Sequence, residues 1–245
     1  MAPKKITIAG SSTGTSLLPK APPATVGRMS LYLRELQRLE DAGVVSTNSR
    51  DLARRLDVSP EVVRRDLAIL GSIGRRGVGY EIVVLAERLR ATLGSDTDWR
   101  VVLVGTGSLG HALLRYQGFE RLGFRLVAAL DIDPKRIGEK IANVTIRDAR
   151  KMDAIFQELR PQLAILAVPA EAAAEVATKI VAAGVTGILN FAPTSLKLPR
   201  GIGVVNVDLA SEMQRLAFNV SHQARQSSEE PSTKEKTSAN PSTNA

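Results

Sequence analysis

The chain of 245 residues has no cysteine, two histidines and few aromatic residues, which make up 4% of the total. The absence of cysteine excludes disulfides, thiolate metal sites and cysteine nucleophiles. No apolar run reaches the roughly 18 residues that a membrane helix needs, and the first twenty residues lack the apolar core of a signal peptide. We therefore expect a cytoplasmic protein.

The length and the charge suggest two domains and an anionic partner. A chain of 245 residues is long enough for two modest domains, each with its own core. The formal net charge is +8, which favours an anionic partner but serves solubility equally well. Residues 1–22 and 223–245 are rich in Ser, Thr, Lys and Pro and have no hydrophobic period, so we expect a flexible arm and a flexible tail.

The first half of the chain has the pattern of a helix-turn-helix. Apolar residues at helical spacing predict a helix over residues 25–42, ended by Gly43. A short helix over 49–56 follows. The sequence Ser-Pro-Glu at positions 59–61 then supplies an N-cap, a proline and an acid for a third helix, which we expect to reach about residue 70.

A wing is expected to follow these helices. Residues 72–80 contain three glycines and predict a hairpin, and residues 81–93 predict a closing helix. The interpretation is a winged-helix domain over residues 23–97, with the helix-turn-helix at about 29–68.

Three adjacent arginine pairs fall within this motif: Arg54 and Arg55, Arg64 and Arg65, and Arg75 and Arg76. Any single pair is explained by surface solubility. Three pairs on the second helix, the third helix and the wing favour DNA binding, with the third helix in the major groove and the wing near the backbone or minor groove.

The second half opens with a dinucleotide-binding fingerprint. Residues 101–110 read VVLVGTGSLG, and a second strand ends in Asp131 about twenty residues further on. Gly105 allows a tight turn, Gly107 lets the backbone approach a pyrophosphate, and Gly110 lets the next helix pack on the sheet. Asp131 favours NAD over NADP, although Lys135 and Arg136 weaken that preference. The alternative is a tight turn without a ligand.

The remaining pattern alternates strands and helices. We expect strands at 100–104, 124–131, 163–168, 186–190 and 203–207, and helices at 109–117, 148–159 and 170–183. Such apolar strands predict an α/β Rossmann-like fold, a doubly wound parallel sheet over residues 98–207. Loops after two later strands, at 168–170 and 190–193, should complete a pocket, although their prolines could simply end the strands.

A final helix is expected over residues 208–221. Its apolar stripe could cover the sheet, but we favour packing on a partner subunit, because helix-turn-helix proteins usually bind DNA as two-fold dimers. The stripe consists of Leu209, Met213, Leu216 and Val220.

Candidate catalytic groups are few. His111 directly follows the fingerprint and His222 lies near the tail, and none of the three tyrosines has a lysine four residues on. We predict no catalytic residue and no metal site, and therefore binding without turnover, although a lysine or aspartate could still serve as an acid or base.

Five segments carry a resemblance to a known family: VRRDLAILGSIGRRGVGY (63–80), VGTGSLGHAL (104–113), LDIDPKRIG (130–138), AVPAEAA (167–173) and ILNFAP (188–193). Through them the chain resembles the Rex family of redox-sensing transcriptional repressors, over nearly all of residues 22–221. The resemblance implies an N-terminal winged helix, a Rossmann domain, and a homodimer with its C-terminal helix, residues 208–222, swapped into the partner. It also implies repression that is relieved when NADH rises against NAD.

The resemblance further assigns residues to these roles. Implied NAD(H) contacts are Gly105, Thr106, Gly107, Ser108, Leu109, Gly110, Asp131, Val168, Pro169, Asn190, Phe191, Ala192 and Pro193. Implied DNA contacts are Ser59, Arg64, Arg65, Arg75 and Arg76. Implied switch residues are Arg34, Tyr116 and Asp208. The chain departs from many relatives at Ile69, Leu70 and Ile73, where aromatics are common, so operator preference is expected to differ.

Two other classes of protein remain open. One is an NAD-dependent oxidoreductase fused to a DNA-binding module. The other is a nucleotide-binding scaffold that contacts no DNA.

Overall fold

The computed structural model describes residues 21–74 and 78–229. Residue contacts divide the chain into two compact units. The first comprises Met1–Trp99 and Gln117–Arg125, and the second comprises Arg100–Tyr116 and Leu126–Ala245. The short segment Gln117–Arg125 joins the first unit because Leu122 packs against the core of that unit.

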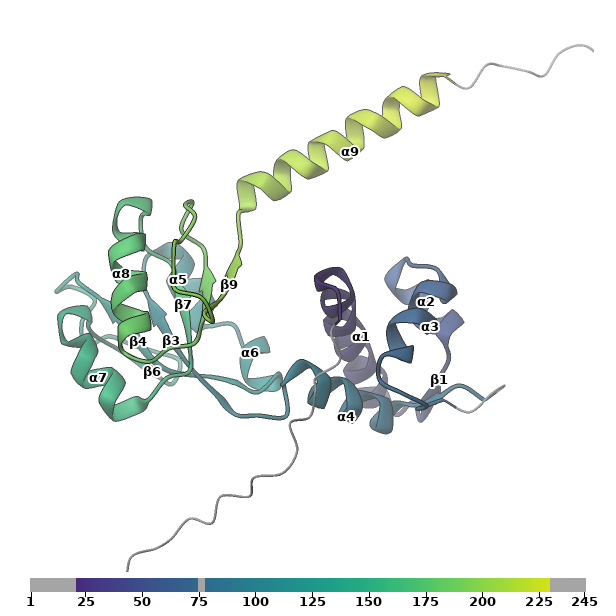
Figure 1. The fold of residues 1–245 in the computed structure, drawn as a ribbon, viewed down its shortest axis with the longest axis horizontal. Coiled ribbons are helices and arrows are strands. Elements are labelled where there is room, and N and C mark those ends of the chain that lie inside the picture. Colours follow the sequence, from purple (N-terminus) through teal and green to yellow (C-terminus); the bar gives the residue numbers. More distant parts are fainter. Residues whose placement is uncertain (1–20, 75–77, 230–245) are drawn as a thin grey trace, which may run out of the picture. The chain divides into compact units, whose positions relative to one another are not determined.

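The first unit is built mainly from helices. In chain order they are α1 (Pro23–Asp41), α2 (Ser49–Leu56), α3 (Pro60–Ala68), α4 (Ile82–Leu93) and the single turn α6 (Gly118–Arg121) (Figure 1). Apolar residues at three- and four-residue spacing form a core between α1, α2, α3 and α4. Burying each large side chain contributes about 1.5–3 kcal/mol. Core side chains include Met29, Leu33, Leu36, Leu52, Val63, Ile82, Leu85 and Leu89.

The helix-turn-helix has the cap at Ser59 that its sequence predicted and a second cap, at Asn48, that was not predicted. The Asn48 side chain caps α2 by accepting from the N–H groups of Arg50 and Asp51, and Ser59 caps α3 by accepting from Val62. Between the two helices Asp57 adopts the left-handed conformation, with φ of 52°. This residue ends α2 and turns the chain into α3.

The predicted wing is described only in part. The described strands are β1 (Ser46–Thr47) and β2 (Tyr80–Glu81), which pair with each other in antiparallel fashion. Residues 72–74 form no strand, and residues 75–77 lie outside the described part of the chain. The hairpin predicted over residues 72–80 therefore stays a prediction, while the described strand β2 pairs with the segment before α2.

The second unit is a mostly parallel sheet of seven strands. The order of the strands is β5-β6-β4-β3-β7-β8-β9, and only the pair β5 and β6 is antiparallel among the registered pairs. Their bounds are β3 (Trp99–Val104), β4 (Phe124–Asp131), β5 (Lys140–Ile141), β6 (Val144–Asp148), β7 (Leu163–Leu166), β8 (Gly187–Asn190) and β9 (Gly203–Asn206).

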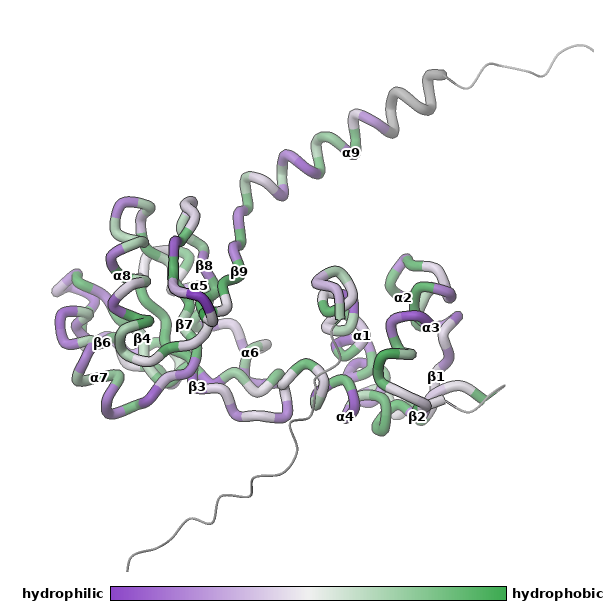
Figure 2. Tube along the Cα trace, in the orientation of Figure 1, coloured by the Kyte–Doolittle hydropathy of each residue, from purple (hydrophilic) through white to green (hydrophobic). Residues whose placement is uncertain are grey.

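Helices cover both faces of the central strands. The helices are α5 (Ser108–Leu114), α7 (Met152–Leu159), preceded by a 3-10 turn (Ala149–Lys151), and α8 (Ala170–Ala182). Val102 and Val104 of β3 belong to the cluster that α7 and α8 form with the sheet. Leu103 points the other way, toward Gly110 of α5. The central strands are coloured largely hydrophobic in Figure 2, as burial on both faces requires.

The chain order creates a switch point in this sheet. From β3 the chain moves outward to β4 and β6 on one side, then returns to β7, β8 and β9 on the other side. This is the doubly wound arrangement that the sequence predicted. In such sheets a crevice opens at the carboxyl ends of the strands where the order reverses, here β3 and β7.

The last helix is longer than predicted. α9 spans Leu209–Glu229, so the tail expected to begin at residue 223 is helical through residue 229. The reason is that residues 222–229 contain neither proline nor glycine, and Pro231 is the next residue that stops a helix. In the described part of the chain no helix is both long and apolar enough to cross a membrane.

Candidate functional sites

The glycine turn lies at the switch point of the sheet, and backbone atoms pack closely against two of its glycines. Gly105 has φ of +94°, and a Cβ atom there would collide with the carbonyl oxygen of Ala167, which follows β7. A Cβ atom on Gly110 would collide with the carbonyl oxygen of Gly105. Two of the three glycines are therefore required by the packing of the protein itself.

Gly107 differs from its two neighbours. Its φ is −60°, which any residue adopts, and the nearest atom to an added Cβ is Nη1 of Arg136 at 3.8 Å. Because this is an ordinary van der Waals distance to the end of a flexible side chain, the packing does not require glycine here. In a dinucleotide-binding turn this is the position where a bare backbone meets a phosphate group.

Asp131 is tied to the same turn. Its Oδ2 accepts from the backbone N–H of Thr106 at 2.8 Å and from the Thr106 hydroxyl at 2.6 Å. Its Oδ1 accepts from the N–H groups of Ile132 and Asp133. Burial opposes ionisation of Asp131, but these hydrogen bonds outweigh it and hold the pKa of the carboxyl below its usual range.

The carboxylate of Asp131 is consequently ionised and surrounded by hydrogen-bond donors. Its four hydrogen bonds occupy the roughly four lone-pair positions of a carboxylate. Arg136 lies nearby, with Nη1 at 3.6 Å from Oδ2. A ribose hydroxyl that donates to Asp131 would have to share Oδ2 with the Thr106 hydroxyl or displace it.

The loops after β7 and β8 were also expected to contact the cofactor. Val168 is brought to the turn, since its Cγ1 would lie 3.0 Å from a Cβ on Gly105. Pro169 is the residue before the first turn of α8. Phe191 and Pro193 are at least partly accessible, whereas Ala192 is buried.

Asn190 holds the loop that follows β8. It is fully buried, and its Nδ2 donates to Oδ1 of Asn206 and to the carbonyl of Thr194, both at 2.9 Å. Its Oδ1 accepts from the N–H of Ala192 at 3.0 Å. The expected contact between Asn190 and a ligand would therefore require the loop to open, and in the structure the side chain fixes the loop instead.

The other fingerprint residues have distinct places. Thr106 is fully buried against Asp131, and Ser108 and Leu109 start α5, where both are exposed. His111 lies on α5 with Nε2 at 3.8 Å from Oε2 of Glu139. Among the described residues, no three His, Asp or Glu side chains are grouped to hold a metal ion.

The arginine pairs of the first unit have different surroundings. Arg64 and Arg65 are exposed on α3, and Arg64 donates to Oγ of Ser49 at 3.1 Å and to Glu61. Arg54 pairs with Asp51 at 2.8 Å on the surface of α2. Arg55 instead reaches Glu35 of α1, with Nη1 at 3.0 Å from Oε1. Arg75 and Arg76 lie outside the described residues.

A groove runs beside Arg64. Its volume is about 780 Å³, and it lies between the start of α2, the end of α3 and the residues leading into β2. Residues lining it include Asn48, Ser49, Arg50, Arg64, Gly71 and Tyr80. Ser59, the other predicted DNA contact, is exposed at the start of α3, where its hydroxyl accepts from the N–H of Val62 at 3.3 Å.

The three predicted switch residues lie in different units. Arg34 is exposed on α1 of the first unit, whereas Tyr116 and Asp208 belong to the second. Tyr116 follows α5 and is 56% exposed. Asp208 precedes α9 and accepts from the N–H groups of Ala210 and Ser211 and from the Ser211 hydroxyl, which lower the pKa of its carboxyl. Their grouping stays a prediction.

Comparison with known proteins adds two matches to family models. A model described as a CoA binding domain matches residues 96–194, and one described as the N-terminus of a putative DNA-binding protein matches residues 20–68. The redox-sensing transcriptional repressor Rex of Rhodopirellula baltica is 56% identical over 211 residues, which cover 86% of this chain and 89% of that protein. The chain belongs to the Rex family.

Other members of the family support the same assignment. The Rex repressor of Streptomyces coelicolor is 43% identical over 85% of this chain and 80% of its own length. Among solved structures, RSP in complex with β-NAD+ and operator DNA matches with a TM-score of 0.77 and 29% identity, over 87% of this chain and 98% of RSP. RSP in complex with β-NADH matches with a TM-score of 0.76 and 28% identity, over 85% of this chain and 98% of RSP.

Rex membership explains why both halves occur in one chain. Relatives named as repressors favour a sensing role for the dinucleotide fold over the oxidoreductase alternative. The match to RSP covers 87% of this chain and 98% of RSP, so the architecture is that of the family.

Proposed function

We propose that this Rex-family chain is a homodimeric repressor that acts in the cytoplasm and leaves its operator when NADH rises against NAD. The observation that carries the proposal is the identity of 56% with a Rex repressor over both units of the chain. RSP, a structural neighbour, has been captured with β-NADH and, separately, with β-NAD+ and operator DNA.

The dinucleotide binds at the switch point of the sheet. The pyrophosphate lies over Gly107 at the start of α5, where backbone N–H groups and the helix dipole favour an anion. The ionised Asp131 accepts from the adenosine ribose, which shares Oδ2 with the Thr106 hydroxyl or displaces it, and disfavours the 2′-phosphate of NADP. The residues around Val168 and Phe191 line the remaining crevice.

Operator DNA binds the first unit. α3 enters the major groove with Arg64 and Arg65, and Ser59 at the start of the helix contacts the backbone. Arg75 and Arg76, which lie outside the described residues, are the further DNA contacts that the resemblance implies. The palindromic operator matches the two-fold symmetry of the dimer.

The dimer forms through α9. Its apolar side chains are exposed, with 63% for Leu209, 64% for Met213, 54% for Leu216 and 58% for Val220, and Figure 2 shows hydrophobic segments along the helix. An amphipathic helix without a core of its own gains by packing on a second subunit. Swapping of α9 between subunits brings Asp208 to Arg34 and Tyr116 as the switch.

The redox response requires a difference in affinity. NADH releases DNA only if it binds the off-DNA conformation more tightly than the on-DNA conformation, and NAD must discriminate less. A tenfold effect on operator affinity corresponds to about 1.4 kcal/mol of coupling.

A binding and turnover assay separates this function from catalysis. The dimer is titrated with NADH, NADPH and coenzyme A, and NADH absorbance is then followed with a panel of carbonyl compounds. We expect stoichiometric NADH binding, weaker NADPH and coenzyme A binding, and no consumption. Steady NADH oxidation, or a preference for coenzyme A, would contradict the proposal.

A further inference from the structure

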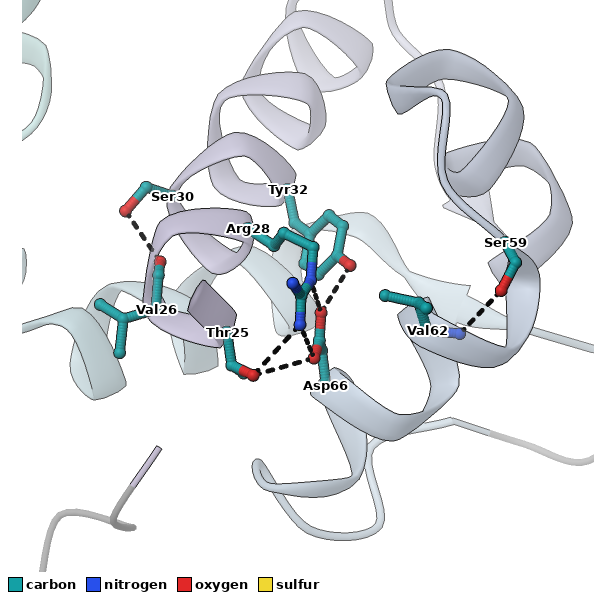
Figure 3. A network of polar contacts seen from close by, with 8 residues as sticks. All are labelled: Thr25, Val26, Arg28, Ser30, Tyr32, Ser59, Val62 and Asp66. Atoms are coloured by element: carbon teal, nitrogen blue, oxygen red, sulfur yellow. Dashed lines mark hydrogen bonds and ion pairs between the residues drawn. The ribbon is translucent and has the colours of Figure 1, made fainter. Parts of the chain in front are cut away.

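The recognition helix α3 carries a carboxylate that is not needed on a DNA-binding surface. Asp66 is 1% exposed and lies one residue after Arg65, on the face of α3 that turns away from solvent. Its two oxygens accept four hydrogen bonds, drawn in Figure 3. A buried charge is costly unless it is fully paired, so the donors restrict where Asp66, and with it α3, can lie.

All donors come from one face of α1. Arg28 donates Nε to Oδ2 at 2.6 Å and Nη2 to Oδ1 at 2.8 Å, the two-pronged geometry of a strong pair. The hydroxyl of Tyr32 donates to Oδ2 at 2.8 Å, and the hydroxyl of Thr25 donates to Oδ1 at 3.2 Å. We call this set, Asp66 with Thr25, Arg28 and Tyr32, the Asp66 clamp.

The clamp is directional as well as strong. Burial alone would raise the pKa of Asp66, but the hydrogen bonds from Arg28, Tyr32 and Thr25 hold the pKa below its usual range. A purely apolar contact between α1 and α3 would tolerate small rotations and shifts. A bidentate guanidinium and a phenol hydroxyl instead fix both the rotation of α3 and its position along α1.

The same helix also holds α2. Glu35 is 7% exposed and accepts from Arg55 of α2 at 3.0 Å. Both helices of the helix-turn-helix are thus held to α1 by a buried carboxylate. The carboxylate belongs to α1 in the contact with α2 and to α3 in the contact with α3. Arg34, the switch residue of α1, lies next to Glu35 and two residues after Tyr32.

We propose that the Asp66 clamp couples the recognition helix to α1, so that a displacement of α1 carries Arg64 and Arg65 with it. In this proposal Asp66, Arg28 and Tyr32 are positioning residues, which act through Arg64 and Arg65. The inference rests on the proposed function, since it supplies the link between the switch on α1 and the DNA-contacting side chains.

The test compares operator affinity with and without saturating NADH in the full-length dimer. The quantity measured is the ratio of the two dissociation constants. The variants are Tyr32→Phe, which removes one donor and keeps the ring, and Asp66→Asn, which removes the charge. Glu40→Gln is the matched control, because Glu40 also lies on α1 but faces Arg90 of α4, with 3.8 Å between the charged atoms.

We expect the ratio to fall at least threefold in Tyr32→Phe and further in Asp66→Asn, with the control unchanged and with NADH affinity in the absence of DNA unchanged. A role confined to stability would weaken operator binding equally with and without NADH, because it does not distinguish the two states. A wild-type ratio in folded Tyr32→Phe would therefore overturn the clamp, even if Asp66→Asn failed to fold. A wild-type protein without any NADH effect would overturn the proposed function and the clamp together.

Discussion

At the scale of single residues, the three glycines of the turn are needed for different reasons. A Cβ at Gly105 or Gly110 would collide with backbone atoms of the protein, whereas a Cβ at Gly107 would meet only Nη1 of Arg136, at 3.8 Å. The fingerprint in the sequence predicted all three but could not separate a glycine that the fold requires from one that a ligand requires. The distances from an added Cβ to its neighbours in the structure distinguish the two cases.

Substitution of Gly107 by alanine tests this division. Since φ at Gly107 is −60°, alanine fits without strain, and we expect an unchanged Tm together with NADH binding at least tenfold weaker, or about 1.4 kcal/mol. Gly105→Ala should lower both Tm and NADH affinity. Fluorescence titration and thermal unfolding measure the two quantities.

Gly138→Ala is the matched control for strain. Gly138 has φ of +91° with no atom within 4 Å of an added Cβ, so it carries the backbone cost of Gly105 without the collision. We expect a loss of about 1 kcal/mol in the free energy of unfolding and normal NADH binding. NADH binding of wild-type strength in Gly107→Ala would show that no phosphate lies over this residue.

Asp66 makes the stability of the first unit sensitive to acid. Because the folded state lowers the pKa of this carboxyl, its contribution is fully present above the ordinary Asp pKa of about 3.9. It is lost as the pH falls through the lower folded value. We expect urea unfolding of the first unit to lose stability steeply below about pH 4, and Asp66→Asn to flatten this limb of the profile. Equal acid limbs in the two proteins would contradict the assignment.

At the scale of elements, the strong local signals located most helices and strands. The cap at Ser59 and the apolar spacing of α1 are short-range features, so the sequence was sufficient to find them. β5 and β6 were missed, since strands of two and five residues in a polar stretch have too few positions to show a period. The pairing of β2 with β1 joins residues far apart in the chain, which no local pattern encodes.

The apolar face of α9 is the element most directly tied to assembly. We expect the double substitution Met213→Glu and Leu216→Glu to convert the dimer to a monomer, because it places charges in the middle of an apolar interface. The control is Gln214→Glu, which adds a charge outside the stripe. Sedimentation velocity measures the mass, and a dimer of unchanged stability in the double variant would exclude α9 from the interface.

At the scale of the whole molecule, the sequence was sufficient for the family and the two-part organisation. It was not sufficient for the network that links helices within the first unit. The donors that pair with Asp66 lie 34 to 41 residues away in the chain, so no local pattern points to them. Arg55 looked like part of a DNA surface, and the structure places it against Glu35. Both depend on tertiary contacts.

The central claim is that one chain converts a cofactor ratio into operator occupancy. The measurement that tests it most directly is a titration of a palindromic operator duplex with the dimer, at constant total NADH plus NAD and constant salt, while the ratio of the two is varied. We predict that the apparent dissociation constant for the operator rises at least tenfold as NADH replaces NAD. A flat response across the full range of the ratio would contradict the account.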